Sequence, residues 1–527
     1  MKKEAVFSLF LFLLIASVVH AQQSVADSSS REPVYIIHAT NFYFKKIDAT
    51  TELKILSGKV ELKQGTVLFF CDSCVVNSTG HVFEAFGSVH INDNDTTNIY
   101  SDNLRYLTNT RIAYFNGNVR MTDGRATLTT PDLTYDVNTK IGTYTNGGKV
   151  VNKKSVLTSR AGTYYSDLRD IAFKTNVELK DPAYYLKTDS LLYNTETQLA
   201  HFTSETYIKD SSGRVMRTRE GYYDMAHRHS EFYTRSTVED RSMFASADSM
   251  ASDDSTKIIQ MRGRAVMKDT AKGMNVLANE IFINQKTDAF LATKKPLMIV
   301  RQDNDSIYVA ADTLFSARLT DLYQKDTAKL KSLHLKEKDS TNRYFEAYRN
   351  VRVFSDSVQS VGDSLYYSFQ DSTFRLFHDP VAWSQKSQIT GDTIYLYTKN
   401  KKASRIQAFE NSFMVNEVQG GVYNQIKSSR MDGYFKNGSL DSVRAKGLAE
   451  SIYFIQDEDS SYRGTNQTKS DAIDIYFDKG DLYKVIFRSD LKGTLYPITQ
   501  KGPGEMRLSN FKWVINRRPK TKYELFE

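Results

Sequence analysis

Long apolar runs are almost missing from this chain. Beyond residue 21 no run approaches the roughly 18 apolar residues of a membrane-spanning helix, and the mean hydropathy is −0.47. We therefore predict no membrane-spanning segment after that point. Proline is scarce, with 8 residues in 527, which is compatible with regular strands. The net charge is +8, but charges of both signs are interspersed and no basic cluster exists, which argues against a nucleic-acid partner.

Catalytic and metal-binding signatures are also missing. The chain has no Gly-x-Ser-x-Gly elbow, no Walker-type phosphate loop and no His-Glu-x-x-His pair. His227 and His229 could share a strand face, but no further ligand is clustered near them, so we place them on a connecting turn. Cys71 and Cys74 have Cys-x-x-Cys spacing, which is compatible with a redox pair or half a metal site. Cys74 stands at the inward position where other copies of the repeat have Leu or Ile. Residues three apart on a strand face opposite sides, which makes a bridge between the two cysteines awkward. We therefore interpret both as small buried hydrophobic residues.

The sequence contains instead about fourteen copies of a repeat of roughly 30 residues. Its clearest copy is Ser101–Tyr106, a polar turn, and then Ala113–Met121. A period of this size indicates a stacked array in which no single unit closes its own core. Two short patterns mark the copies: an aspartate one or two residues before an apolar residue, and a glycine or asparagine one or two residues before a further apolar residue. The first recurs at Asp102, Asp189, Asp312, Asp363 and Asp392, and the second at Gly87, Gly117, Gly263 and Asn350.

Apolar and polar residues alternate within both halves of the repeat. Leu104 and Tyr106 share a parity, as do Phe115, Val119 and Met121. Alternation with period two predicts strands with one buried face rather than helices. Each unit is thus expected to be a strand, a turn and a strand, in an all-β chain whose two facing sheets enclose an apolar interior. Candidate inward residues are Leu104, Tyr106, Phe115, Val119, Met121, Leu133 and Tyr135.

The repeated aspartates are the obvious acid/base candidates, since paired carboxylates drive glycoside hydrolysis. A catalytic pair would be a local departure from the repeat, whereas these aspartates recur at the same place in unit after unit. That behaviour is typical of a residue that forms a turn or begins a strand. We predict no catalytic residue, no cofactor and no metal, and so no enzyme.

The N-terminus has the pattern of an export signal. Lys2 and Lys3 precede an apolar run, Ala5–Val19, which is followed by His20 and the small residue Ala21. This predicts a cleavable signal peptide over residues 1–21, cut after Ala21. No cysteine stands at the cleavage point, so no lipid anchor is expected.

Composition divides the remaining chain into four parts. Two repeat blocks are expected at 22–317 and 345–499, separated by a charged polar insertion at 318–344 that lacks turn signals. The last part, 500–527, is basic and is expected to be poorly ordered.

Several copies of the repeat resemble a known family. Tyr100–Tyr106 followed by Ala113–Met121 resembles the OstA/LptA repeats of the lipopolysaccharide-transport machinery, and Phe83–Ile91 and Asp379–Asp392 are similar to long OstA-like envelope proteins. The resemblance extends over about residues 35–497. It implies an elongated open β-jellyroll with a hydrophobic groove for acyl chains. It also implies a non-enzymatic periplasmic bridge that carries lipopolysaccharide toward the outer membrane and takes part in outer-membrane biogenesis.

The resemblance further implies partners. Like-folded jellyroll proteins, including the outer-membrane translocon, would stack on this chain edge to edge. The chain differs from the short bridge protein in its greater length, and from the translocon in lacking a carboxy-terminal membrane barrel. Two other hypotheses remain open: an exported β-helical polysaccharide hydrolase or lyase, and a structural repeat protein with a filled core and no ligand.

Overall fold

The computed structural model describes residues 32–93, 97–271, 273–301, 306–336, 339–399, 402–419, 421–457, 459, 461–501 and 505–526. The proposed signal peptide, residues 1–21, lies outside the described residues. Within them the chain is all-β, with two short α-helices and two 3₁₀ turns. It divides into two compact units: unit 1 comprises the residues up to Gly148 and Thr163–Asp167, and unit 2 comprises Lys149–Gly162 and Leu168–Glu527.

The strands of unit 1 are β1 (Tyr35–His38), β2 (Asn41–Lys46), β3 (Glu52–Gln64), β4 (Val67–Asn77), β5 (Val82–Asp93), β6 (Thr97–Leu107), β7 (Ile112–Thr122), β8 (Ala126–Asp136) and β9 (Ile141–Tyr144). Two strands have residues in both units: β10 (Gly148–Asn152) and β12 (Ala161–Tyr165).

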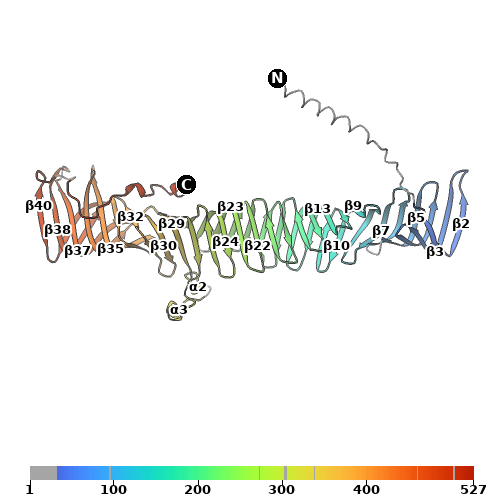
Figure 1. Ribbon diagram of the computed structural model, residues 1–527, viewed down its shortest axis with the longest axis horizontal. Helices are drawn as coiled ribbons and strands as arrows, with labels where there is room; N and C mark the ends of the chain where they lie inside the picture. The colour runs from blue at the N-terminus through green and yellow to red at the C-terminus, as the bar shows by residue number, and fades with distance from the viewer. Residues whose placement is uncertain are drawn as a thin grey trace, which may run out of the picture. The chain divides into compact units, whose positions relative to one another are not determined.

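The elements of unit 2 follow in chain order (Figure 1). They are β11 (Ser155–Ser159), β13 (Asp170–Lys180), β14 (Tyr184–Asn194), β15 (Leu199–Phe202), β16 (Thr206–Asp210), β17 (Val215–Thr218), β18 (Gly221–Asp224), β19 (His229–Phe232), β20 (Ser236–Asp240), β21 (Met243–Ala247), β22 (Ser249–Asp253), β23 (Ile258–Asp269), β24 (Met274–Asn284), β25 (Ala289–Thr293), β26 (Leu297–Arg301), β27 (Ser306–Ala310), β28 (Thr313–Ala317), α2 (Leu319–Leu322), α3 (Thr327–Leu333), β29 (Tyr344–Phe354), β30 (Gln359–Ser368), β31 (Thr373–Phe377), β32 (Val381–Ser384), β33 (Ser387–Thr390), β34 (Thr393–Lys399), β35 (Lys402–Gln419), β36 (Val422–Lys436), β37 (Ser439–Gln456), β38 (Tyr462–Asp478), β39 (Asp481–Arg488) and β40 (Lys492–Pro497), with 3₁₀ turns η1 (Ile515–Arg517) and η2 (Lys522–Leu525).

Each long strand bends in the middle, and this bend explains the glycine–asparagine pattern of the repeat. In β7 the antiparallel register breaks between Asn116 and Val119, where Gly117 and Asn118 have φ of +81° and +46°. Two left-handed residues in succession form a bulge that turns the strand. The bend divides each long strand into a part that we call limb A (for example residues 112–116) and a part that we call limb B (119–122). The predicted all-β jellyroll of strand–turn–strand repeats is confirmed.

The repeated aspartates lie at these bends and hold neighbouring bends together. Asp102 Oδ2 accepts a hydrogen bond of 2.8 Å from Asn118 Nδ2. Asn350 and Asn411, which also have positive φ, donate in the same way to Asp312 and Asp392. At these three positions the aspartates thus join one strand to a neighbouring strand.

The bend also corrects the prediction for the two cysteines. Cys74 pairs across the strands with Leu56 and Ala85, and Cys71 pairs with Val60; both thiols are free and buried. The expectation that they face opposite sides was wrong, because the bend between them resets the alternation. Both thiols lie on the inner face as small buried groups, and the hydrogen bond to Cys71, together with burial, raises the pKa of Cys74.

Strand pairing continues past the insertion at 318–344. The segment contains α2 and α3, while β28 pairs directly with β29. Figure 1 shows the two helices projecting from the strands of unit 2. At the base of the insertion Leu319 is buried with Ala317 and Tyr344.

The C-terminal segment differs from expectation. Residues 505–526 do not extend away from the fold but pack on the sheet of unit 2, with Met506, Leu508 and Leu525 buried. The basic composition suggested an unordered tail, but the apolar residues between its charges decide its position. The proline and arginine content of the segment does not show that unit 2 has a surface on which its apolar residues can pack.

Candidate functional site

The seven predicted inward residues all lie in the interior of unit 1, and each is no more than 2% exposed. They form rows across neighbouring strands. On limb A, Leu104 pairs with Phe115, which pairs with Leu133. On limb B, Met121 pairs with Ile99 and Leu128. The interior of unit 1 is thus lined by apolar side chains on both limbs, as the alternation predicted.

Tyrosines occupy the interior rows nearest the end of limb A. Tyr106 packs against Phe69 and Phe83, with ring centroids 4.8 and 5.1 Å apart. Its hydroxyl donates a hydrogen bond of 2.5 Å to Gln64 Oε1, and Gln64 is the last residue of β3. The contact therefore joins the far end of limb A to the far end of limb B, on the side of the interior away from the bend.

The same contact recurs with the period of the array. Tyr135 donates to Asp93 Oδ2 at 2.8 Å and Tyr164 donates to Asp123 Oδ2 at 2.6 Å. In unit 2, Asn152 Nδ2 donates to the Tyr193 hydroxyl at 3.1 Å. The partners are 41 or 42 residues apart in every case. We call these four contacts the tyrosine row.

The hydroxyls of Tyr106 and Tyr135 remain protonated over a wide pH range. Burial raises the pKa of Tyr106 to about 12. Burial and the Asp93 carboxylate also raise the pKa of Tyr135. A neutral hydroxyl can donate to a carboxylate, whereas a phenolate could not. We call the side of the interior away from the bend, where the far ends of limbs A and B meet, the mouth. The hydrogen bonds of the tyrosine row close the mouth, and they can break without a change of charge.

The tyrosine row was not predicted, although Tyr106 and Tyr135 were placed correctly on the inner face. Alternation reports which face a residue occupies, but not whether its hydroxyl finds a partner. A signal exists in retrospect: a polar residue stands at an otherwise apolar inward position about 42 residues before each tyrosine.

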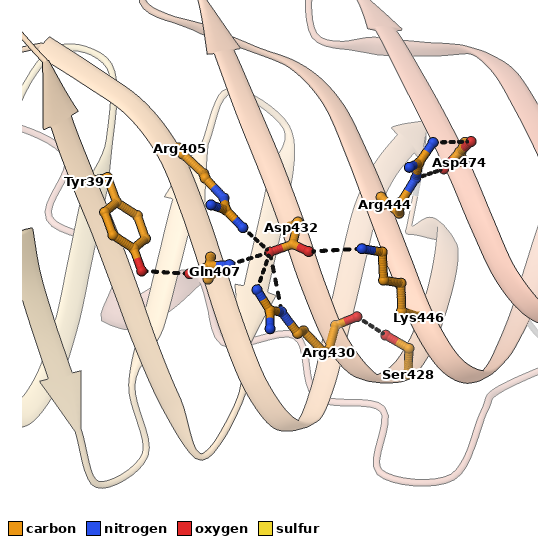
Figure 2. Close-up of polar contacts among 9 residues, drawn as sticks. All are labelled: Tyr397, Arg405, Gln407, Ser428, Arg430, Asp432, Arg444, Lys446 and Asp474. Carbon is orange, nitrogen blue, oxygen red and sulfur yellow. Dashed lines mark hydrogen bonds and ion pairs between the residues drawn. The ribbon is translucent and has the colours of Figure 1, made fainter.

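A second polar arrangement lies on the limb A surface of unit 2, across β35–β39. Asp432 is only 2% exposed and accepts hydrogen bonds from Gln407 at 2.5 Å and Arg405 at 2.8 Å. Arg430 lies 3.2 Å and Lys446 3.7 Å from the same carboxylate (Figure 2). Burial opposes ionisation of Asp432, but the Gln407 hydrogen bond and the arginines hold its pKa below the usual range.

Asp474 repeats this arrangement one strand pair further along. It accepts from Arg444 at 2.5 and 2.9 Å and from Arg488 at 2.5 Å. The hydrogen bond from Arg444 lowers the pKa of Asp474 despite its burial. Carboxylates that stay ionised and are enclosed by guanidinium groups are poor proton donors. The arrangement can hold strands together, and it does not have the raised pKa of a general acid.

The first strands of unit 1 carry exposed apolar side chains. β1 and β2 both pair with β3, and Tyr35, Ile37, Phe42, Tyr43 and Phe44 are each between 52% and 60% exposed. Large apolar side chains that are this exposed, on consecutive edge strands, are typical of an interaction surface.

Neither metal ligands nor a membrane helix is found in the described part of the chain. No group of three or more His, Cys, Asp or Glu side chains there could hold a metal ion. His227 contacts Asp224 at 2.8 Å, and His229 contacts Glu231 at 3.1 Å. None of the described helices is long and apolar enough to cross a membrane.

Comparisons with known proteins agree with the repeat analysis. The family described as OstA-like protein matches residues 31–189. No curated protein sequence matches the chain. Among solved structures the chain is similar to LptH of Pseudomonas aeruginosa, the LptA homologous periplasmic component of a conserved lipopolysaccharide transport device. That match has 14% identity and a TM-score of 0.20, and covers 26% of this chain and 82% of that chain. The family match over residues 31–189 agrees with the OstA/LptA resemblance of the repeats in that region.

Proposed function

We propose that this protein is an exported, non-enzymatic bridge that binds lipopolysaccharide in the periplasm and passes it toward the outer membrane. The OstA-like region supports an Lpt-type lipid-transport role in general. The observation that carries the more specific proposal is the apolar interior between limbs A and B of unit 1. Leu104, Phe115 and Leu133 line one wall of it, and Val119 and Met121 line the other.

Binding would be passive. Each methylene of an acyl chain that leaves water contributes about 0.8 kcal/mol. The interior side chains are already packed, so acyl chains must separate the limbs and break contacts of the tyrosine row. Several buried methylenes offset the loss of one hydrogen bond of the row, which contributes about 1–3 kcal/mol. Lipid would therefore enter by opening the mouth locally, one repeat at a time.

The exposed apolar strands β1 and β2 fit the docking edge of such a bridge. An edge strand offers unpaired backbone groups to a partner strand, and strand addition joins two sheets into one. We infer that a like-folded jellyroll protein, of the kind that the outer-membrane translocon would present, docks at this end. Phe42 and Phe44 would be buried in the joint.

Site-specific crosslinking in cells tests the proposal. A photoreactive amino acid at Phe115 or Leu133 is expected to form lipopolysaccharide adducts on irradiation. The matched control is Tyr114, a neighbour on the same strand that faces outward and is 43% exposed. Adducts at Tyr114 and not at the inward positions, or no adducts at any of the seven inward positions, contradict the proposal.

A structural repeat protein without ligand is the second candidate, and one observation favours it: the interior residues are at most 2% exposed with the mouth closed. Purification under mild conditions distinguishes the two. A bridge retains bound lipid that mass spectrometry detects, whereas a filled structural core retains none. For the hydrolase alternative, the acidic groups that depart from the repeat are Asp432 and Asp474, and both are held as ion pairs.

A further inference from the structure

The C-terminal segment lies on unit 2 as a strap, a name that we use for residues 505–526. After β40 the chain turns back and runs along the strands in reverse order (Figure 1). Successive strap residues contact strands that occur progressively earlier in the chain. The pairs in order are Leu508 with Gln425 of β36, Val514 with Gln388 of β33, Arg518 with Gln359 of β30, Glu524 with Arg352 of β29, and Leu525 with Ala310 of β27.

Beneath the strap, the outer face of limb B carries apolar side chains, whereas the same face in unit 1 carries polar ones. In β35, Met414 faces the interior, yet its neighbours Phe413 and Val415, on the outer face of limb B, are also buried. They form a cluster with Ile452, Phe454 and the strap residues Met506 and Leu508. In unit 1 the corresponding outer face of limb B carries His90, Tyr100 and Arg120. A strand buried on both faces needs a second covering layer, and the strap is that layer.

Two buried glutamine side chains form hydrogen bonds with the backbone of the strap. Gln425 Oε1 accepts from Leu508 N at 2.9 Å, and its Nε2 donates to Met506 O at 3.2 Å. Gln388 Oε1 accepts from Val514 N at 2.9 Å, and its Nε2 donates to Lys512 O at 2.7 Å. Both side chains are at most 1% exposed. Each amide satisfies one backbone donor and one backbone acceptor of the strap.

An arginine fixes the position of the strap along the sheet. Arg518 donates to Gln359 Oε1 at 2.6 and 2.9 Å and to the carbonyl of Gln385 at 2.7 Å. At an adjacent site Val514 packs against Trp383 and its neighbours. The recognised pattern is therefore a peptide with spaced apolar residues, turns at Leu508–Phe511 and Val514–Arg517, and a half-buried guanidinium that follows them.

No backbone ladder joins the strap to the sheet among the described residues. The backbone-to-backbone hydrogen bonds made by the strap are internal, such as Phe511 N to Leu508 O and Arg517 N to Val514 O. Every hydrogen bond between strap and sheet uses a side chain on at least one side. The strap can leave without disrupting any strand pair, as a bound peptide ligand can.

We propose that the outer face of limb B over β26–β37 is a peptide-recognition site, and that its occupant can be the strap of a second copy of this chain. Exchange of an identical segment forms new contacts equal to those that are lost, so it links two copies at little cost in free energy. Own-strap occupancy dominates at low concentration because the tether gives it a high effective concentration. At high protein concentration a strap-exchanged dimer forms.

Cleavage of the tether in the folded, full-length protein tests this proposal. A specific protease site is inserted between Gly502 and Gly504, and the intact chain is folded before it is cut. The cut strap is expected to co-elute with the body on size exclusion and to be replaced by a fluorescent synthetic peptide of residues 505–527. Leu508 and Trp513 both pack in the apolar cluster beneath the strap. A peptide carrying Leu508→Asp and Trp513→Asp leaves the body unaltered and should bind at least 100-fold more weakly. Gln388→Ala with Gln425→Ala in the body should weaken binding at least tenfold.

Two further results decide the partner. Full-length chains carrying different labels, mixed at high concentration, are expected to form a mixed dimer by light scattering, and Leu508→Asp with Trp513→Asp should abolish it. Loss of the cut strap together with failure of the labelled peptide to bind overturns the recognition site. A cut strap that stays bound but never exchanges, with labelled chains that stay monomeric, overturns exchange and makes the strap a permanent part of the fold.

Discussion

The hydroxyl of Tyr135 lies 2.8 Å from Asp93 Oδ2, and this contact joins the far end of limb A to the far end of limb B in unit 1. Both side chains are buried, at 0% and 3% exposure. The limbs are covalently continuous only through the bend at the other side of the interior. The tyrosine row therefore decides how easily the interior opens.

Removing one hydroxyl of the tyrosine row should loosen the mouth. Tyr135→Phe leaves a buried carboxylate without one of its donors, which costs about 1–3 kcal/mol. We expect the free energy of unfolding in urea to fall by that amount and lipid uptake by the purified protein to become faster. Tyr114→Phe is the control, because Tyr114 is 43% exposed and faces outward. Faster uptake in the control, or an unchanged free energy in Tyr135→Phe, contradicts this role.

The raised pKa of Tyr106 predicts a loss of stability at alkaline pH. Its folded-state pKa of about 12 lies above the value near 10 of an unfolded chain, so folding favours the neutral hydroxyl. The resulting stabilisation is complete below pH 10 and is lost as the pH rises toward 12. The loss of stability is about 3 kcal/mol at most. Urea unfolding at several pH values should show a shallower alkaline decline in Tyr106→Phe than in Tyr114→Phe.

The charged arrangement on unit 2 predicts acid sensitivity. Asp432 has a lowered pKa, so its stabilisation is present above pH 4 and is lost as the pH falls through the folded-state pKa. Asp432→Asn leaves Arg405, Arg430 and Lys446 without their shared anion. We expect a loss of about 1–3 kcal/mol at pH 7, discounted because the cations are half exposed.

A matched surface pair controls for charge alone in that experiment. Asp490 and Lys492 form an ion pair in which both side chains are at least 70% exposed, and Asp490→Asn should change stability by less than about 0.5 kcal/mol. Equal losses in Asp490→Asn and Asp432→Asn would mean that burial of the Asp432 carboxylate does not matter.

Local sequence patterns predicted the interior of the fold well. Residues such as Leu104 and Phe115 alternate with polar neighbours, and alternation depends only on the geometry of a strand. The same reasoning failed at Cys71 and Cys74, because a bend lies between them and alternation holds only along an uninterrupted strand. Inward and outward positions can be assigned across a bend only when the positions of the residues with positive φ are known.

Local sequence patterns did not predict contacts between segments that lie far apart in the chain. Gln425 and Leu508 are 83 residues apart, and neither residue type suggests the other. A trace of the strap was present in the apolar triplet Phe413–Val415, which breaks the alternation of its strand. Such a triplet indicates a second buried face, but it does not identify the segment that covers it. Tyr135 and Asp93, 42 residues apart, were unpredictable for the same reason.

The bend at Gly117 provides a last prediction with a close control. Gly117 has φ of +81°, and an added Cβ would lie 2.5 Å from Asp102 Oδ2. Gly124 has φ of +82°, and no atom lies within 4 Å of the corresponding Cβ position. Substitution by alanine strains the backbone equally at both positions, by about 1 kcal/mol. Gly117→Ala must in addition displace Asp102 and break its hydrogen bond to Asn118, so it should be less stable than Gly124→Ala by about 1–2 kcal/mol. Equal stability of the two variants in urea would mean that the link between neighbouring bends does not contribute to the stability of the stacked repeats.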